Sequence, residues 1–507
     1  MTWDRRRFLT TGGAVVAGVW LAGCTSGSSS PSTAAPAPSG RLMSPTNPAI
    51  VAREAERRSA GAGATAIDLT ARPMTVDLGG IMVDTTGYGD SVPGPVVRVR
   101  AGDELTVRFR NQLTDPTVIH WHGLAIRNDM DGVPHLTQDP IPGDGEFTYR
   151  FVVPDPGTYW FHPHMGLDLD RGMYAPIIVD DPDEPGDYDN EEILILDDWI
   201  DGIDGASPDT VLADLEAAGG MGHGGMGEMM GGNDDNGGGM MGMNAFGDVD
   251  YPFHLINGRA PSDPVTVGAR SGGRIRLRII NAGSDTIYRF AIGGHTLTVT
   301  HLDGFPITPI EVDTVLLAMG ERVDAIVTVA DGVAPIVASA EGKTGAGLAW
   351  LRSTGSTAGA SEPVSSLAEH SGRMLDVTAA VAAESVAYPI GDPDRQVDVA
   401  LGQDMGAYRW TINGATFGNR EPLTIDAGER VRLVFSNQTM MAHPMHLHGH
   451  TFALATPGAA RKDTLLVPVM GRAAVDVIAD NPGQWMLHCH NTYHLEAGMA
   501  TTLAYLA

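Results

Sequence analysis

The feature that most constrains this chain lies near its C-terminus, where one cysteine stands between two histidines. The stretch contains His488, Cys489 and His490, followed by His494 and Met499. A thiolate, imidazoles and a thioether at this spacing offer the trigonal ligand set, with a weak axial methionine, of an electron-transfer copper. Adjacent side chains of a strand point to opposite faces, so the histidines that flank Cys489 cannot bind the same metal as the cysteine. The sequence therefore predicts two metal sites joined through Cys489, as in an enzyme that passes electrons to a second centre.

Three further His-x-His pairs occur in the chain, at His120–His122, His162–His164 and His446–His448. The two-residue period of a strand places both imidazoles of a pair on one face, where they can bind neighbouring metals. One such pair would be weak support, because single histidines are mostly surface or core residues. Four pairs in one chain are not expected by chance, and together they supply eight imidazoles.

The length and composition favour a large, turn-rich β protein. A chain of 507 residues is long enough for two to four domains with ample cores. It contains 64 glycines and 33 prolines but only 6% aromatic residues, which suits many short strands joined by turns. The net charge of −29 argues against binding to nucleic acid, and favours cationic substrates or simply solubility.

The N-terminal residues have the pattern of an export signal. Three arginines at 5–7 precede the apolar run 8–23, which is too short for an ordinary membrane span. This is the twin-arginine pattern, and Leu21-Ala22-Gly23-Cys24 resembles a bacterial lipobox. We expect residues 1–23 to be a signal, and Cys24 to anchor the exported protein by lipid to the outer face of the cytoplasmic membrane. A plain secretory signal or an uncleaved anchor is the alternative.

The residues that follow the signal favour a flexible connection. Residues 25–48 are rich in Ser, Pro and Ala, and we expect residues 24–65 to form a tether. If Cys24 is lipidated, Cys489 is the only thiol left and no intramolecular disulfide can form.

The remainder of the chain repeats at the scale of whole domains. A glycine turn followed by alternating apolar residues and a final asparagine occurs at 102–111, 272–281 and 428–437. Each stretch predicts a half-buried strand after a turn. The separations of 170 and 156 residues are those of β-sandwich domains rather than of short solenoid repeats.

The same repeats indicate where the histidines meet. His120 and His446 each lie nine residues after the asparagine that ends the first and the third stretch. The equivalent position after the second stretch is Phe290. The stretches 156–164 and 482–490, which end in the other two histidine pairs, also match each other. We therefore expect the first and third domains to build a shared metal cluster at their interface, without ligands from the second.

With these motifs in place, the chain resembles the three-domain multicopper oxidases over about residues 66–507. The resemblance implies an all-β fold of three cupredoxin-like Greek-key β-sandwich domains. We expect these domains at 66–183, 184–365 and 366–507, with an insertion at 221–243 in the second.

The resemblance also implies four copper ions and the residues that bind each one. The type 1 copper takes His443, Cys489, His494 and Met499. The type 2 copper takes His120 and His446. The type 3 pair takes His122, His162, His164, His448, His488 and His490.

In this family a one-electron donor reduces the type 1 copper, and electrons cross Cys489 to the other three coppers, which reduce O2 to water. Protons for this reaction require carboxylates. Asp131 matches the family's acid beside the cluster, although Asp131-Gly132 is also a turn signal. Glu496 is a second candidate; copper-oxidising relatives place an acid directly after the type 1 histidine, where this chain has Leu495.

Methionines suggest which donor the protein uses. Residues 221–243 are rich in glycine and contain Met221, Met226, Met229, Met230, Met240, Met241 and Met243. Thioethers are soft ligands that select Cu(I), so we expect this segment to capture copper. The alternative is a low-complexity insertion without function.

Two more methionines, Met440 and Met441, precede His443. Met441 matches a substrate-copper ligand of the cuprous oxidases, and Thr439 stands where those enzymes have an acidic co-ligand. The alternative is that Met440 and Met441 are core residues beside the type 1 copper.

The chain most resembles the exported, lipid-anchored copper-tolerance oxidases of actinobacteria. We therefore expect a monomeric oxidase with Cu(I) and O2 as its substrates, held at the membrane by its lipid and without nucleic-acid partners. One alternative is a laccase-type oxidase of phenols or aryl amines. The other is a copper-binding or storage protein without enzymatic activity.

Overall fold

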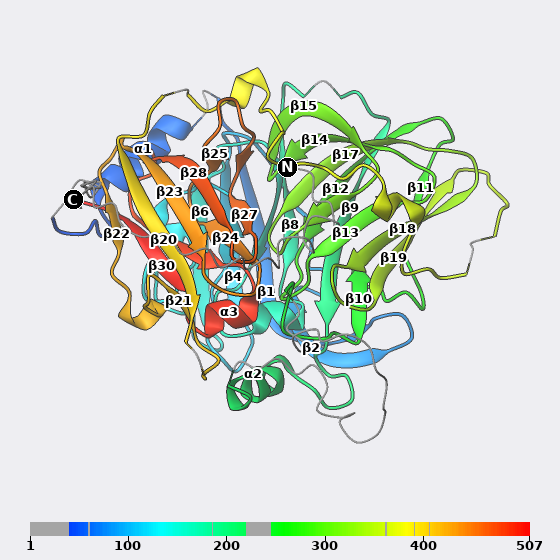
Figure 1. The fold of residues 1–507 in the computed structure, drawn as a ribbon, viewed down its shortest axis with the longest axis horizontal. Helices are drawn as coiled ribbons and strands as arrows, with labels where there is room; N and C mark the ends of the chain where they lie inside the picture. The colour runs from blue at the N-terminus through cyan, green and yellow to red at the C-terminus, as the bar shows by residue number, and fades with distance from the viewer. Residues whose placement is uncertain are drawn as a thin grey trace, which may run out of the picture.

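The computed structural model describes residues 40–58, 61–184, 186–219, 245–359, 362–389, 391–404 and 406–507. They form six sheets that pair into three β-sandwiches, which confirms the expected all-β, cupredoxin-like fold. Figure 1 shows two lobes: the second sandwich, in green, forms one lobe, and the first and third, in blue to cyan and orange to red, form the other.

The first sandwich consists of the sheets β2-β1-β4-β6 and β3-β8-β7-β5. Its strands are β1 (Ala64–Asp77), β2 (Met82–Tyr88), β3 (Val97–Arg100), β4 (Glu104–Asn111), β5 (His120–His122), β6 (Glu146–Val152), β7 (Gly157–His162) and β8 (Ala175–Asp180). Two 3-10 turns, η1 (Asn128–Met130) and η2 (Asp168–Arg171), lie in its loops.

The second sandwich consists of the sheets β10-β9-β12-β17-β14-β15 and β11-β19-β18-β13-β16. Its strands are β9 (Asn190–Trp199), β10 (Phe253–Ile256), β11 (Thr266–Ala269), β12 (Arg274–Asn281), β13 (Tyr288–Ile292), β14 (Leu297–Leu302), β15 (Phe305–Val312), β16 (Val315–Leu317), β17 (Arg322–Thr328), β18 (Val333–Ala340) and β19 (Ala346–Ser353). Helix α2 (Pro208–Ala217) follows β9 and begins with a capping box at Ser207.

The third sandwich consists of the sheets β21-β20-β23-β28-β25-β26 and β22-β30-β29-β24-β27. Its strands are β20 (Arg395–Gln403), β21 (Trp410–Ile412), β22 (Leu423–Ile425), β23 (Arg430–Asn437), β24 (His443–Leu447), β25 (Phe452–Leu454), β26 (Arg461–Lys462), β27 (Thr464–Val467), β28 (Arg472–Ile478), β29 (Gln484–Cys489) and β30 (Ala500–Tyr505). Helix α3 (Thr492–Glu496) joins β29 to β30, and η5 (Phe417–Asn419) lies between β21 and β22.

The linker before the third sandwich contacts both neighbouring domains. It contains η3 (Ala368–Ser371) and η4 (Glu384–Val386), and it pairs with the second sandwich through the bridges Thr314–Met374 and Ile307–Ala382. Leu375 belongs to the second apolar core. Val381 forms a bridge to Ala459 of the third domain, so the linker joins the two sandwiches along its length.

The three sandwiches repeat one topology. The strand that ends in the repeated asparagine runs parallel to the first long strand of its domain, in the pairs β1–β4, β9–β12 and β20–β23. The opposite sheets repeat the parallel pairs β3–β8, β11–β19 and β22–β30. The sequence repeat at 102–111, 272–281 and 428–437 thus corresponds to β4, β12 and β23, each with its preceding turn.

The asparagine that ends each repeat has the same structural role three times. In the second domain, the Nδ2 amide of Asn281 donates to the carbonyls of Thr286 (2.9 Å) and Leu317 (3.0 Å). Its Oδ1 accepts from the backbone N–H of Gly283 at 2.9 Å. Asn111 and Asn437 make the equivalent bonds. Each asparagine therefore fixes the loop that leads to the next strand, which in domains 1 and 3 carries a histidine pair.

The expected tether is wrong for residues 40–58. Asn47 caps helix α1 (Pro48–Arg57), and the backbone N–H of Met43 donates to the carbonyl of Tyr505 at 2.8 Å. Arg53 pairs with Asp480 of the third domain at 3.0 Å. The segment therefore packs across the first and third domains instead of hanging free. None of the helices in the described ranges has the length and apolar character needed to span a bilayer.

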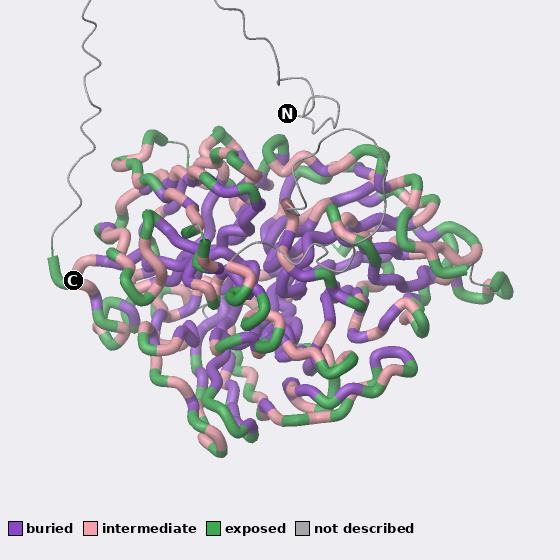
Figure 2. The backbone as a smooth tube through the Cα atoms, turned by 60° about the horizontal axis from the view of Figure 1, so that its bottom comes forward, coloured by how far each residue is buried: buried purple, intermediate pink, exposed green. Residues whose placement is uncertain are grey.

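The interior of each sandwich is apolar, and Figure 2 shows buried backbone running through the middle of both lobes. Large cores belong to the third, second and first sandwich. Cys489 and Met499 lie within the core of the third domain. The expected metal ligands are therefore embedded in rigid sheet structure rather than in surface loops.

We predict that Asn281→Ala destabilises the protein by roughly 3 kcal/mol, because buried carbonyls and an N–H lose their partner. Urea unfolding followed by circular dichroism measures the change. Asn419→Ala is the matched control, since that side chain is exposed and makes one long hydrogen bond to Thr416 at 3.4 Å. Equal stability of the two variants would contradict the assigned role of the repeated asparagine.

Candidate copper centres

Strand pairing brings the histidine pairs of each domain together. In the first domain β5 pairs with β7, and His120 lies opposite His162. In the third domain β24 pairs with β29, and His446 lies opposite His488. The equivalent register in the two domains is what the repeat in the sequence predicted.

The eight imidazoles of the four pairs form one cluster between the first and third domains. Among the groups whose ligand atoms lie within 4.8 Å of one another, several draw on both domains: His164, His448 and His488; His122, His162 and His490; and His120, His122 and His446. His120 and His446 complete the cluster, where His120 stacks on His448 with ring centroids 3.6 Å apart, and His446 on His122 at 3.8 Å. The second domain contributes no histidine to these groups.

The unpaired nitrogens of the cluster fit metal ligands. Among the described residues, the Nε2 atoms of His120, His162, His164 and His446 and the Nδ1 atom of His490 are buried without a hydrogen-bond partner. In three of these rings the other nitrogen, Nδ1, donates to a backbone carbonyl: His120 to Asp131 at 3.0 Å, His162 to Pro163 at 3.0 Å and His446 to Asp463 at 2.9 Å. One held and one free nitrogen is the usual state of a metal-binding histidine.

Burial also sets the protonation of the cluster. Desolvation lowers the pKa of His122, His162 and His164, and of His448, His488 and His490, well below the usual histidine value. These imidazoles are therefore neutral at pH 7, which is the form that binds a metal ion.

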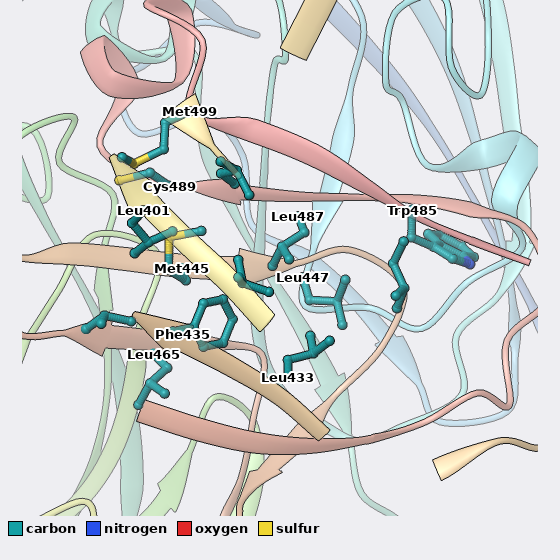
Figure 3. Packing of buried hydrophobic residues seen from close by; sticks show 14 of the residues in the cluster. Leu401, Leu433, Phe435, Met445, Leu447, Leu465, Trp485, Leu487, Cys489 and Met499 are labelled. Carbon is teal, nitrogen blue, oxygen red and sulfur yellow. The ribbon is translucent and has the colours of Figure 1, made fainter. Parts of the chain in front are cut away.

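A second candidate centre lies in the core of the third domain. The Nδ1 atoms of His443 and His494 each lie 3.6 Å from Sγ of Cys489, and 3.1 Å from each other. Figure 3 shows the side chain of Met499 next to Cys489, with the two sulfur atoms on the same side. Asn491 caps α3 by accepting from the N–H of His494 at 3.2 Å, which fixes the position of that ligand. The structure thus brings together a thiolate, two imidazoles and a thioether, which are the donors of a trigonal copper site with an axial methionine.

Cys489 links the two centres. Its neighbours His488 and His490 belong to two different three-histidine groups of the cluster, while its own sulfur faces His443 and His494. Burial raises the pKa of the Cys489 thiol far above its usual value, so binding of a metal ion must displace the proton.

The outer nitrogens of the two histidines in the Cys489 site are both hydrogen-bonded. Nε2 of His443 lies 2.7 Å from the hydroxyl of Thr439. Nε2 of His494 donates to Oδ2 of Asp248 at 2.9 Å, and Tyr408 donates to the same oxygen at 2.7 Å. Both imidazoles are fully buried.

Asp131 contacts two histidines of the cluster. Its Oδ1 is 3.2 Å from Nδ1 of His120, and its Oδ2 accepts from Nδ1 of His448 at 3.0 Å. Burial raises the pKa of Asp131, while the hydrogen bond from His120 opposes that shift. A carboxylate between two ligands of the cluster can orient them and can carry a proton.

Glu496 lies between the solvent and the cluster. It lines a surface cavity of about 650 Å³ together with Tyr408 and Met486, and it also lines a small inner cavity with His162 and His490. The residue is exposed at the surface, and partial burial of its carboxyl group raises its pKa. The position suits a proton carrier.

Asp463 and Arg322 are functional residues that the sequence analysis missed. Oδ1 of Asp463 lies 3.2 Å from Nε2 of His122, and its backbone carbonyl accepts from Nδ1 of His446 at 2.9 Å. Arg322 of the second domain donates to both oxygens of Asp463, at 2.7 and 2.6 Å. Burial alone would raise the pKa of Asp463, but the charge of Arg322 holds it below the usual value.

Gly320, also in the second domain, touches the cluster directly. A Cβ atom at this position would lie 2.8 Å from a carbon of His490 and 2.9 Å from one of His122. Its φ of 86° also favours glycine. No local spacing in the sequence signals these contacts, because they join the second domain to the first and the third.

Nine methionines were predicted to bind substrate copper. Two of them lie in the third domain, and the other seven lie outside the described residues. Met441 is buried in the core with 3% of its surface exposed, whereas Met440 is 54% exposed. The segment that contains Met221, Met226, Met229, Met230, Met240, Met241 and Met243 lies outside the described residues, as does Cys24.

Comparison with known proteins agrees with this geometry. Three family profiles, each described as multicopper oxidase, match residues 70–184, 236–356 and 392–506. The chain is 44% identical to a multicopper oxidase of Mycobacterium tuberculosis, over 99% of this chain and 98% of that one. The chain therefore belongs to the multicopper oxidase family, and it is an oxidoreductase that uses copper.

Two further similarities lie within the same family. A copper resistance protein A homolog of Pseudomonas syringae pv. tomato is 29% identical, over 87% of this chain and 92% of its own length. The crystal structure of a multi-copper oxidase from Pseudomonas thermotolerans matches with a TM-score of 0.68 and 27% identity, over 88% of this chain and 100% of that one.

We predict that Gly320→Ala weakens metal binding at the eight-histidine cluster by about 10- to 100-fold, because the added methyl group displaces His122 and His490. The blue absorption of the Cys489 site should remain, since the atoms nearest to the added methyl group belong to His122 and His490 and not to His443, Cys489 or His494. Metal analysis and the absorption spectrum after copper loading measure both effects. Gly294→Ala is the control, because it has a similar φ of 70° but open space around its Cα. Full copper loading of the Gly320 variant would contradict the assigned contact.

Proposed function

We propose that the protein oxidises Cu(I) to Cu(II) with O2 as the electron acceptor, and thereby protects the cell from copper. The observation that carries this proposal concerns the described residues on either side of the methionine-rich segment 221–243. Both of these flanking stretches lie close to the Cys489 site. On one side, the N–H of Ala442, next to His443, donates to the carbonyl of Ala245 at 2.9 Å. Asp248, three residues further on, hydrogen-bonds His494.

The other end of the segment leads to the same region. A Cβ atom on Gly219 would lie 3.2 Å from the carbonyl of Gly406, two residues before Tyr408, which bonds Asp248. A chain that leaves at residue 219 and returns at residue 245 therefore starts and ends beside the Cys489 site. The sequence between these two ends contains seven methionines, and thioethers favour a soft metal ion as the donor.

The ligand sets support four copper ions. His443, Cys489, His494 and Met499 would hold the type 1 ion, and His120 and His446 the type 2 ion. The groups His122–His162–His490 and His164–His448–His488 would hold the type 3 pair. When bound, these coppers supply the one-electron redox chemistry by which four electrons reach O2 and form two waters.

The protein residues contribute positions and protons. Asp131 fixes His120 and His448 and can deliver a proton within the cluster. Glu496 can take protons from the outer cavity and pass them inward, since it lines both cavities. Asp463, held ionised by Arg322, orients His122 and His446.

Export and anchoring remain part of the proposal. Residues 1–39, with the twin-arginine pattern and Cys24, lie outside the described residues. We propose a monomer that crosses the membrane folded, is lipidated at Cys24 and remains at the outer face of the cytoplasmic membrane. There it would oxidise Cu(I) to the less membrane-permeant Cu(II), without nucleic-acid partners.

A laccase-type activity on phenols or aryl amines is the second candidate, because the same copper centres serve both reactions. Against it, His443 and His494 are fully buried and bonded to Thr439 and Asp248, so an aromatic donor cannot touch either ring. A storage protein is the third candidate. It would bind copper without consuming oxygen.

We predict rapid, saturable oxygen uptake by the copper-loaded protein with Cu(I) held in a weak chelator, and little uptake with a phenol. An oxygen electrode measures both, and deletion of residues 221–243 should slow Cu(I) turnover at low substrate concentration. Cys489→Ser should abolish uptake, because it removes the thiolate that joins the two centres. Preference for the phenol would support the laccase alternative, and no uptake with either donor would support storage.

A separate prediction concerns the proton donors. Asp131→Asn should slow oxygen reduction by about 10²-fold, since the amide cannot supply a proton. Reduction of the blue copper under anaerobic conditions should stay fast, because that step does not involve Asp131. Stopped-flow absorption separates the two steps. Asp129→Asn is the control, because Asp129 pairs with Arg127 at 2.6 Å near the surface. Slow anaerobic reduction in the Asp131 variant would contradict the assignment.

A further inference from the structure

An aromatic side chain covers the histidines of the Cys489 site. The indole ring of Trp410 lies on the imidazole of His494, with ring centroids 4.0 Å apart and the planes inclined by 33°. The same indole meets the ring of His443 at 5.2 Å and 71°. Aromatic pairs in proteins usually have centroids roughly 4.5 to 7 Å apart, so the contact with His494 is unusually close. Trp410 therefore packs against both imidazoles that would bind the metal ion.

The backbone holds this ring in place. Trp410 begins β21, and its N–H donates to the carbonyl of Ala497 at 3.1 Å. Ala497 and Gly498 form the loop between α3, which carries His494, and the ligand Met499. A Cβ atom on Gly498 would lie 3.0 Å from the carbonyl oxygen of Trp410, so the loop and the strand are in close contact. The ring of Trp410 and the loop that leads to Met499 are thus parts of one packed unit.

Water comes close to this unit but does not reach its interior. The surface cavity of about 650 Å³ is lined by Arg409, Ala497 and Gly498, which adjoin Trp410 in the chain or through the contacts just described. Trp410 itself is only 1% exposed, and His494 is fully buried. The indole therefore belongs to the layer that separates the His494 ring from the water of the cavity.

Two effects of this layer on a bound metal ion oppose each other. The face of an indole ring attracts a cation, and so it favours the oxidised, more highly charged form of the ion. Exclusion of water disfavours that form, because a charge loses hydration when it is buried. The second effect is the larger, since the hydration of an ion is stronger than its attraction to one aromatic face. The layer should therefore make the ion easier to reduce.

We propose that Trp410 raises the reduction potential of the Cys489 site, because it keeps water away from His494 and holds that ring in one orientation. Solvent access and apolar surroundings are general determinants of the potential of a metal site. Trp410 is a positioning residue, since it contacts ligands rather than the ion or the electron donor. This role requires copper in the Cys489 site, but it is independent of which donor supplies the electron.

Reduction potentials of three variants test this role. Trp410→Ala opens the layer and should lower the equilibrium constant for reduction of the blue copper about tenfold, which corresponds to about 59 mV. Trp410→Leu covers less of the imidazole and should lower the constant about threefold. Trp410→Phe keeps an aromatic face and should leave the constant within about twofold of the parent value. Anaerobic redox titration followed at the blue absorption measures all three, and persistence of that band shows that copper is bound.

Trp350→Ala is the matched control. Trp350 is 6% exposed and lies in an apolar cluster of the second domain with Val337 and Leu348. The change removes the same atoms and should lower the unfolding temperature as Trp410→Ala does, because both leave a cavity in an apolar core. It should not change the potential. Lower stability with an unchanged potential in the Trp410 variants would make Trp410 an ordinary core residue and overturn the proposal.

Access of water provides a second readout. Pulsed electron paramagnetic resonance in D2O, recorded at the field of the blue copper signal, detects deuterons close to that ion. Beyond the ring N–D groups of His443 and His494, the parent protein and Trp410→Phe should show none, whereas Trp410→Ala and Trp410→Leu should show deuterons of water. If Trp410→Ala does not fold, the leucine variant decides by both measurements. An unchanged potential in that variant would overturn the proposal, and a lower potential without entry of water would overturn exclusion of water as its cause.

Discussion

The buried ion pair between Arg322 and Asp463 connects all three domains to the copper cluster. Both side chains are fully buried, and each charge needs the other because an unpaired ion in the interior is strongly unfavourable. Arg322 comes from the second domain and Asp463 from the third, and Asp463 contacts His122 of the first. The orientation of the histidines therefore depends on correct docking of a domain that binds no metal through its own histidines.

This dependence gives the second domain a role beyond that of a spacer. Gly320 allows its backbone to approach His122 and His490 closely, and Asp248 reaches the outer nitrogen of His494 in the other centre. The domain repeat has thus diverged in function. The first and third copies kept the histidine strands, and the second copy supplies the residues that hold those strands and the Cys489 site in place.

The sequence predicted the parts of the site that local periodicity determines. A two-residue spacing on a strand fixes which face the imidazoles share, so the pairs on β5 and β24 and their partners at 162–164 and 488–490 were identifiable. It did not predict Asp463 or Asp248, because their contacts with His122 and His494 join different domains and no spacing encodes them. Helix α1 was missed although a signal was present, since Asn47 and Pro48 form a helix start. The Ser/Pro-rich composition just before it favoured a tether.

The two hydrogen bonds around the Cys489 site give its two histidines different surroundings. The carboxylate of Asp248 beside His494 is negatively charged, because the hydrogen bond from His494 lowers its pKa against the effect of burial. The hydroxyl of Thr439 beside His443 is neutral, and the exposed Met440 follows it in the chain. A bulky neutral aromatic gains little from a carboxylate or a thioether, whereas a small, soft cation can interact with both. These surroundings support the proposal that the electron donor is a metal ion rather than an organic molecule.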